Sequence, residues 1–125
     1  RRAIAYSNLA AILEARGRYT EALEASMVAI EIMGRTSGVS DPASVALERV
    51  NEAVMRVHLG QHDTAREILS ASIETLRSTE GSDAFILAQP LKVRAWLELD
   101  QGRGAQALAD LDEALAGLEA ADAGA

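Results

Sequence analysis

Three glycines, Gly17, Gly60 and Gly102, divide this 125-residue chain into segments of nearly equal length. They are separated by 43 and 42 residues, and a small residue stands seven before, five after and twelve after each of them. Eight of these nine positions are alanine, far more than an alanine-rich composition explains. The nine positions are Ala10, Ala22, Ala29, Ala53, Ala65, Ser72, Ala95, Ala107 and Ala114. This regularity indicates an internal repeat, which limits the chain to a stack of similar units.

Each unit is predicted to be an antiparallel pair of helices. The glycine ends the first helix, where the backbone needs a positive φ angle. The first two small residues let the paired helices approach closely, and the third makes room for the next unit. The expected helices span residues 2–16, 20–33, 42–59, 63–77, 84–101 and 105–120. The sequence therefore predicts an all-α solenoid of three helix-turn-helix repeats, at about 1–40, 41–82 and 83–125.

Local signals support these boundaries. Asp41 is a good N-cap and Pro42 is tolerated at a first helical position, so a helix is expected to begin there. The turn-rich stretches 34–41 and 78–83 are predicted to link the repeats. Pro90 falls inside an expected helix and removes one backbone hydrogen bond. We therefore expect a kink, or a late helix start, near Gln89.

Composition excludes several classes of protein. The net charge is −7 and the chain has neither a basic run nor an aromatic stacking surface, so nucleic acid is not the expected partner. No apolar run is long enough to cross a bilayer, and cysteine is absent. A soluble, cytoplasmic protein is expected, and the arginine and alanine content is typical of a GC-rich bacterial genome. Because the chain starts at Arg1 within an expected helix, we expect a single domain that is a piece of a longer protein.

The repeat residues resemble those of a known family. Tyr6, Asn8-Leu9-Ala10, Gly17-Arg18-Tyr19, Glu21-Ala22-Leu23 and Ala29-Ile30 are similar to a tetratricopeptide repeat, and the period resembles the longer variant of kinesin light chains. The second and third repeats match best in their second helices. Where the family usually has an aromatic residue two positions after the glycine, the chain has Tyr19, His62 and Gly104. His62 is therefore expected to replace a tyrosine at an inter-repeat turn.

The resemblance implies a right-handed superhelix whose first helices line a concave groove that binds peptides. Asn8 and Asn51 occupy equivalent positions, where the family often uses asparagine to hydrogen-bond a ligand backbone, whereas the third repeat has Val93. The carboxylate clamp of the family is not expected, since only Asn51 matches it; Ser7, Ala11, Gln89 and Val93 occupy its other positions. The candidate groove residues are Asn8, Arg49, Val50, Asn51, Val54, Lys92 and Trp96, with Ile4, Leu47 and Arg56 nearby.

Some of these residues have a second interpretation. The apolar candidates could pack in the core instead, and Trp96 could fill the interior of the last repeat. In the second and third repeats, Glu52/Arg56 and Arg94/Glu98 form opposite-charge pairs spaced four residues apart. Solvent-exposed pairs are the favoured interpretation. The alternative is an ionic ladder between neighbouring first helices.

Enzymatic chemistry is not expected, because no phosphate-binding glycine loop or metalloprotease motif is present. His58, His62 and Asp63 lack a further ligand at suitable spacing, so neither a metal nor another cofactor is predicted. The expected function is protein–protein interaction, within a bacterial signalling or regulatory protein. Most of the negative charge falls on the second helices, which predicts an acidic convex back and a nearly neutral groove.

A structural role is the alternative function. The last helix carries leucines at helical spacing where a further repeat would dock, and terminal repeats normally have a polar outer face. These leucines are Leu108, Leu111, Leu115 and Leu118. Leu111, Leu115 and Leu118 are the candidates for self-association as a homodimer or for contact with another part of the parent protein.

Overall fold

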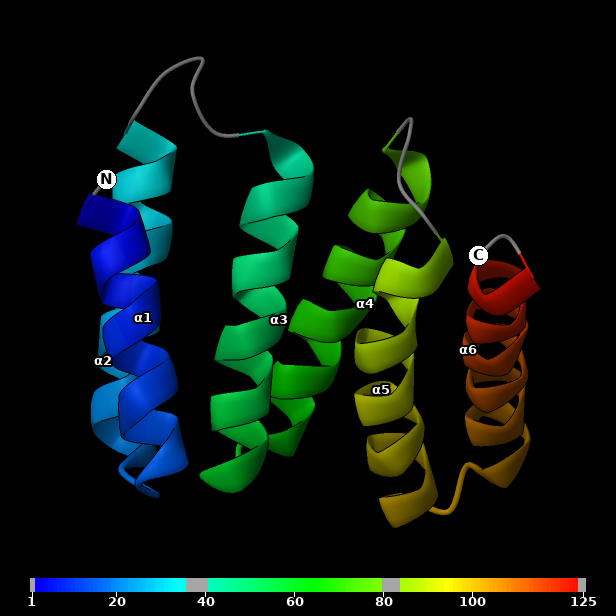
Figure 1. Cartoon of the computed structure of the whole chain (residues 1–125). Coiled ribbons are helices and arrows are strands. Elements are labelled where there is room, and N and C mark those ends of the chain that lie inside the picture. Colours follow the sequence, from blue (N-terminus) through cyan, green and yellow to red (C-terminus); the bar gives the residue numbers. More distant parts are fainter. Residues whose placement is uncertain (1, 36–40, 80–83, 124–125) are drawn as a thin grey trace.

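The computed structural model describes residues 2–35, 41–79 and 84–123, and this part of the chain is all-α (Figure 1). The expected six helices are present, with ends close to those predicted. They are α1 (Arg2–Ala15), α2 (Tyr19–Arg35), α3 (Pro42–His58), α4 (His62–Ser78), α5 (Ala88–Asp100) and α6 (Gly104–Ala123), with a 3₁₀ turn, η1 (Ala84–Leu87), before α5. The predicted links lie largely outside the described residues, at 36–40 and 80–83.

The helices form three hairpins that stand side by side. Helix α1 packs on α2, α3 on α4 and α5 on α6, while α2 packs on α3 and α4 packs on α5 (Figure 1). The second helix of one hairpin thus contacts the first helix of the next. This is the all-α repeat solenoid that the sequence predicts.

The turn glycines end the first helices as expected. Gly60 has a φ of 79°, its N–H donates to the carbonyl of Val57 at 3.0 Å, and the next N–H, of Gln61, donates to Arg56 at 2.8 Å. These two bonds are the Schellman motif. Gly17 and Gly102 have φ angles of 75° and 77° and the same hydrogen-bond pattern. A Cβ at any of the three would meet nothing within 4 Å, so the backbone angle rather than space requires glycine.

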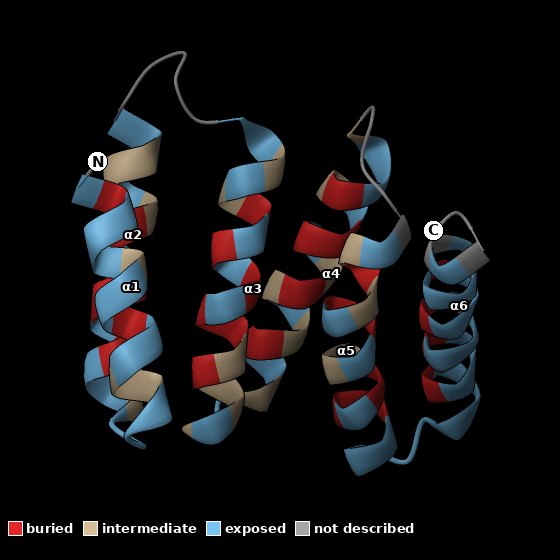
Figure 2. Cartoon of the chain, in the orientation of Figure 1, coloured by how far each residue is buried: buried red, intermediate tan, exposed pale blue. Residues whose placement is uncertain are grey.

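All nine repeated small residues are buried, with at most 7% of their surface exposed. Larger core residues fill the space between them in three aliphatic clusters, and each cluster takes residues from more than one hairpin. Figure 2 shows the buried residues on the faces that the helices turn toward one another. The core therefore runs along the row of hairpins, as a repeat array requires.

Two helix starts follow from local chemistry. Asp41 caps α3, because its side chain accepts a hydrogen bond of 2.7 Å from the backbone N–H of Ser44, and Pro42 is the first helical residue. That hydrogen bond is the main cause of a lowered pKa at Asp41, and the Ser44 hydroxyl adds to it. Pro90 lies in the first turn of α5, where the missing N–H is not needed. The late start expected near Gln89 is confirmed, at Ala88.

The charged pairs differ from both interpretations of the sequence. Arg56 and Glu52 do bond within α3 at 2.8 Å, but the Glu52 side chain is only 4% exposed, so the favoured solvent-exposed interpretation is wrong. Arg94 turns away from Glu98 and makes two hydrogen bonds, of 2.9 and 2.8 Å, to Asp110 of α6. In the described residues no ion pair joins α3 to α5, so the ladder between first helices is also wrong. Spacing within a helix could not reveal a partner that the next helix supplies.

A buried glutamate links the first two hairpins. Glu48 of α3 is 6% exposed and accepts hydrogen bonds from the hydroxyls of Ser7 in α1 and Ser26 in α2, the latter at 2.9 Å. Burying a carboxylate is costly unless hydrogen bonds replace its hydration. The two serines supply those bonds, so this contact favours one register between the hairpins.

Candidate functional site

One row of side chains recurs on the first helices of the three hairpins. It consists of the residues thirteen, nine and six positions before each glycine, which share a helix face because they are spaced by four and three residues. The row contains Ile4, Asn8 and Ala11 on α1, Leu47, Asn51 and Val54 on α3, and Gln89, Val93 and Trp96 on α5. Seven of the nine are exposed, and Val54 and Val93 are half-buried. None of the nine carries a charge. The chain thus presents a neutral, partly apolar face, and we call it the first-helix face.

The two asparagines of this face are open to a ligand. Asn8 and Asn51 are both exposed, and in the described part of the chain no side chain or backbone group hydrogen-bonds to either amide. Each follows an exposed aliphatic residue by one helical turn: Ile4 is 64% exposed and Leu47 is 42% exposed. An amide both donates and accepts. The arrangement can therefore pair with a peptide backbone while apolar side chains lie beside it.

Three predicted groove residues lie elsewhere. Val50 is 1% exposed and packs with Leu69 and Leu97 in the core, because the position ten before the glycine faces the following hairpin. Its prediction as a groove residue is therefore corrected. Lys92 holds the equivalent position in α5 and is exposed at the end of the row of hairpins. Arg49 lies 3.3 Å from Glu52 and lines a cleft between α3 and α4, away from the first-helix face.

Trp96 lies on α5 beside the Gly60 turn of the preceding hairpin rather than in the interior. Half of its surface is exposed, and its ring meets the ring of His62 edge-on with centroids 5.5 Å apart. His62 Nδ1 also lies 3.5 Å from a carboxylate oxygen of Asp100. At the equivalent turn before it, Tyr19 stacks on His58 at 4.1 Å. His62 thus takes the place of a tyrosine, as predicted, with different partners.

No group of three potential ligand side chains that could hold a metal occurs among residues 2–35, 41–79 and 84–123. Over the same residues, none of the helices combines the length and apolar character needed to cross a bilayer.

An apolar pocket of about 700 Å³ adjoins the first-helix face, since Leu47 and Gln89 of that face line it. It brings together two sets of residues that the sequence predicted separately, since Lys92 and Leu47 line it along with the self-association candidates Leu111, Leu115 and Leu118 of α6. Phe85, 54% exposed, also lines it and was missed by the sequence prediction. Phe85 is the only phenylalanine of the chain and precedes Pro90 in an expected helix, and this was the sequence signal that could have identified it. The full lining is Leu47, Phe85, Ile86, Ala88, Gln89, Lys92, Leu111, Ala114, Leu115 and Leu118.

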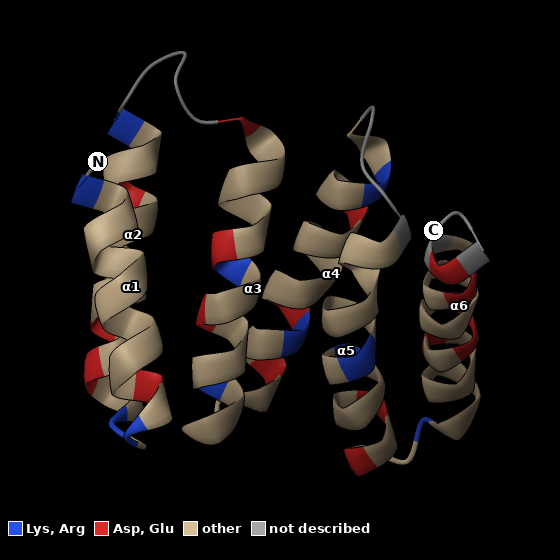
Figure 3. Cartoon of the chain, in the orientation of Figure 1, with Lys and Arg blue, Asp and Glu red and all other residues tan. Residues whose placement is uncertain are grey.

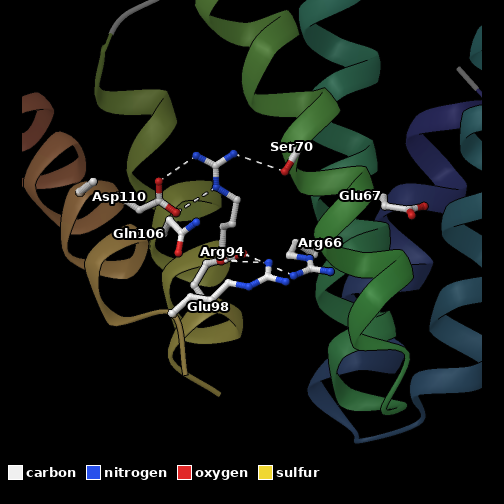
Figure 4. A pocket seen from close by; sticks show the side chains of 9 residues that line it. Arg66, Glu67, Ser70, Arg94, Glu98, Gln106 and Asp110 are labelled. Atoms are coloured by element: carbon white, nitrogen blue, oxygen red, sulfur yellow. Dashed lines mark hydrogen bonds and ion pairs between the residues drawn. The ribbon is translucent and has the colours of Figure 1, made fainter. Parts of the chain in front are cut away.

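A second pocket, of about 560 Å³, is polar and lies between α4, α5 and α6 (Figure 4). Its arginines already have carboxylate partners: Arg94 binds Asp110, while Arg66 and Arg103 lie 3.9 and 3.4 Å from Glu98. The hydrogen bond from Arg94 to Asp110 is the main reason that the pKa of Arg94 is raised. Because the positive charges are compensated inside the pocket, it serves to join helices rather than to attract an anion.

Comparison with known proteins finds one family. Two family models, each described as tetratricopeptide repeat, match residues 2–43 and 43–120, and both are of the kinesin light chain-like type. The search of curated proteins returned no match.

Proposed function

The chain belongs to the tetratricopeptide repeat family, and on that premise we propose that it binds an extended segment of a partner protein along the first-helix face. Tetratricopeptide repeats are generally protein–protein interaction modules and typically act as scaffolds without enzymatic activity. The proposal adds the location of the binding face and the chemistry of the segment that it takes.

The observation that carries the proposal is the pair of unoccupied amides. Asn8 and Asn51 hold the same position in adjacent repeats, are exposed, and have no hydrogen-bond partner among the described residues. An extended peptide has N–H and C=O groups that need partners when water is displaced. Two amides at the repeat spacing can supply partners at two points along such a segment.

The composition of the face selects the kind of segment. Ile4, Leu47 and Trp96 are large, exposed apolar side chains, and no charged residue occupies the nine positions of the face. Tryptophan in particular is frequent where binding energy is concentrated. We therefore expect a neutral segment with apolar anchors, and not the acidic C-terminus that a carboxylate clamp would hold.

A peptide-library selection followed by calorimetric titration tests the proposal. Replacing both Asn8 and Asn51 by alanine should weaken a selected peptide by roughly 5- to 150-fold, since each lost hydrogen bond contributes about 0.5–1.5 kcal/mol. Gln106→Ala is the matched control, because it removes an exposed amide from α6 without touching the face. Peptides that bind the double variant as tightly as the original chain would refute this location of the binding face.

A further inference from the structure

Helix α6 carries an apolar surface that its counterpart α4 buries. At nine, thirteen and sixteen positions after the turn glycine, α4 has Leu69, Ile73 and Leu76, which are 0–1% exposed because α5 and η1 cover them. The same positions in α6 are Leu111, Leu115 and Leu118, which are 40%, 54% and 42% exposed. They line the apolar pocket described above. No helix in the described part of the chain covers this surface.

Helix α1 has the complementary surface. Five positions before the turn glycine, Met55 of α3 and Leu97 of α5 are both 1% exposed, since each packs against the preceding hairpin. The equivalent residue of α1 is Ile12, which is 54% exposed. Tyr6 and Leu9 are exposed on the same side of α1, at 37% and 43%. Thus α1 leaves open the face by which α3 and α5 attach to the hairpin before them.

We propose that α1 of a second copy of this chain docks on α6, in the way that α5 docks on α4. Leu97 shares a core cluster with Leu69, so Ile12 of the second copy would lie against Leu111. Leu91 shares a second core cluster with Ile73 and Leu76. Tyr6 holds the position of Leu91, eleven before the turn glycine, and would therefore lie against Leu115 and Leu118.

Charge favours this head-to-tail contact over a symmetric one. Helix α6 contains five carboxylates and neither lysine nor arginine, which Figure 3 shows as a helix with red segments and no blue. Asp112, Glu119 and Asp122 have no ion-pair partner among the described residues. Two α6 helices brought together would set these like charges against each other.

The docked α1 instead brings a basic residue to the acidic helix. Arg2 holds the position of Leu87, which packs with Leu76. In the contact with a second copy it would lie beside Leu118, next to Glu119. The two surfaces are therefore complementary in shape, because they repeat the contact between α4 and α5. They are also complementary in charge, because α1 brings Arg2 to the acidic helix α6. Because they are different surfaces, the contact leaves one of each free and allows a chain of copies.

This inference does not depend on the peptide-binding proposal. The contact rests on Tyr6 and Ile12 of α1 and on leucines of α6, none of which belongs to the nine residues of the first-helix face, so failure to bind a peptide would not argue against the head-to-tail contact.

Two variants, each blocking one surface, test the contact by sedimentation velocity. The double variant Leu111→Glu, Leu115→Glu blocks α6, and the double variant Tyr6→Glu, Ile12→Glu blocks α1. Each double variant would bury unpaired charge in the contact and should lower the association constant at least about tenfold. The 125-residue chain itself should grow in average mass with concentration. An equimolar mixture of the two variants should form a dimer that grows no further, because each variant keeps one intact surface.

Controls make the test decisive. Leu99→Glu adds a charge at an exposed leucine of α5 that lies outside both surfaces and should leave association unchanged. All substituted positions are exposed, and circular dichroism verifies that the variants fold. Leu115→Ala is a milder replacement and should weaken association less than the double change Leu111→Glu, Leu115→Glu. A chain that stays monomeric up to about 1 mM, a range in which specific contacts are measurable, would overturn the proposal. So would a mixture that fails to pair, or an α1 variant that still dimerises through α6.

Discussion

Replacing Asp110 by alanine should destabilise the third hairpin by about 2–3 kcal/mol. Removing one partner of a fully buried ion pair costs about 3–5 kcal/mol, because a buried charge is left without compensation. The Arg94 side chain is 19% exposed and keeps a hydrogen bond of 3.3 Å to Ser70, so solvent and Ser70 recover part of this loss. Changing the other partner, Arg94→Leu, leaves the Asp110 carboxylate without its ion-pair partner. Because the Asp110 side chain is only 10% exposed, this change should cost about 3–4 kcal/mol.

The double variant Arg94→Leu, Asp110→Ala should differ from the original chain by less than about 1 kcal/mol, because replacing a buried pair by apolar residues is often neutral. The chain itself contains this arrangement: Leu9 and Ala25 hold the equivalent positions, eight before and eight after the glycine of the first hairpin. The coupling energy between the two substitutions should therefore be at least about 4 kcal/mol.

Urea denaturation measures all four proteins. Trp96, the only tryptophan, lies on α5 and reports on the third hairpin, whereas far-ultraviolet circular dichroism reports on all of the helices. The two signals need not coincide, since repeat arrays can unfold in parts. A double variant destabilised by the sum of the two single changes would show that Arg94 and Asp110 do not interact, and would refute the assigned contact.

Further substitutions test the turn, the core and the helix cap. Gly60→Ala should cost about 1 kcal/mol because its φ of 79° suits glycine. Gly34 lies within α2 and has open space where a Cβ would be, so Gly34→Ala should stabilise the fold by up to about 1 kcal/mol. Equal urea midpoints for the Gly60 and Gly34 variants would contradict the argument from the φ angle. Ala53→Leu, at a fully buried position, should cost about 1–3 kcal/mol through overpacking, visible as a lower melting temperature, and no change would mean that the hairpins can separate. The pKa of Asp41 is lowered in the folded chain, so its stabilisation is present above the unfolded value of about 3.9 and lost as pH falls through the folded pKa. The stability advantage of the original chain over Asp41→Asn should therefore shrink below about pH 4, and parallel melting curves across that range would count against the cap.

The sequence alone determined the hairpins. A positive φ is so costly for other residues that the three turn glycines marked the helix ends, and close helix packing requires small side chains, so the alanine positions marked the interfaces. Asp41 and Pro42 identified a helix start for equally local reasons. These signals depend on the backbone of one helix or one turn, which is why the family and the helix boundaries could be read without coordinates.

The tertiary structure decided which side chains meet across helices. Arg94 has Glu98 at helical spacing, yet binds Asp110, because α6 places a carboxylate closer and in the right direction for two hydrogen bonds. Val50 and Lys92 occupy equivalent positions, but α5 buries the first whereas no described helix covers the second. Periodicity gives a residue its face on one helix. Burial, the partner of a charge and the openness of a binding face depend on the neighbouring helix, and only the packed structure supplies it.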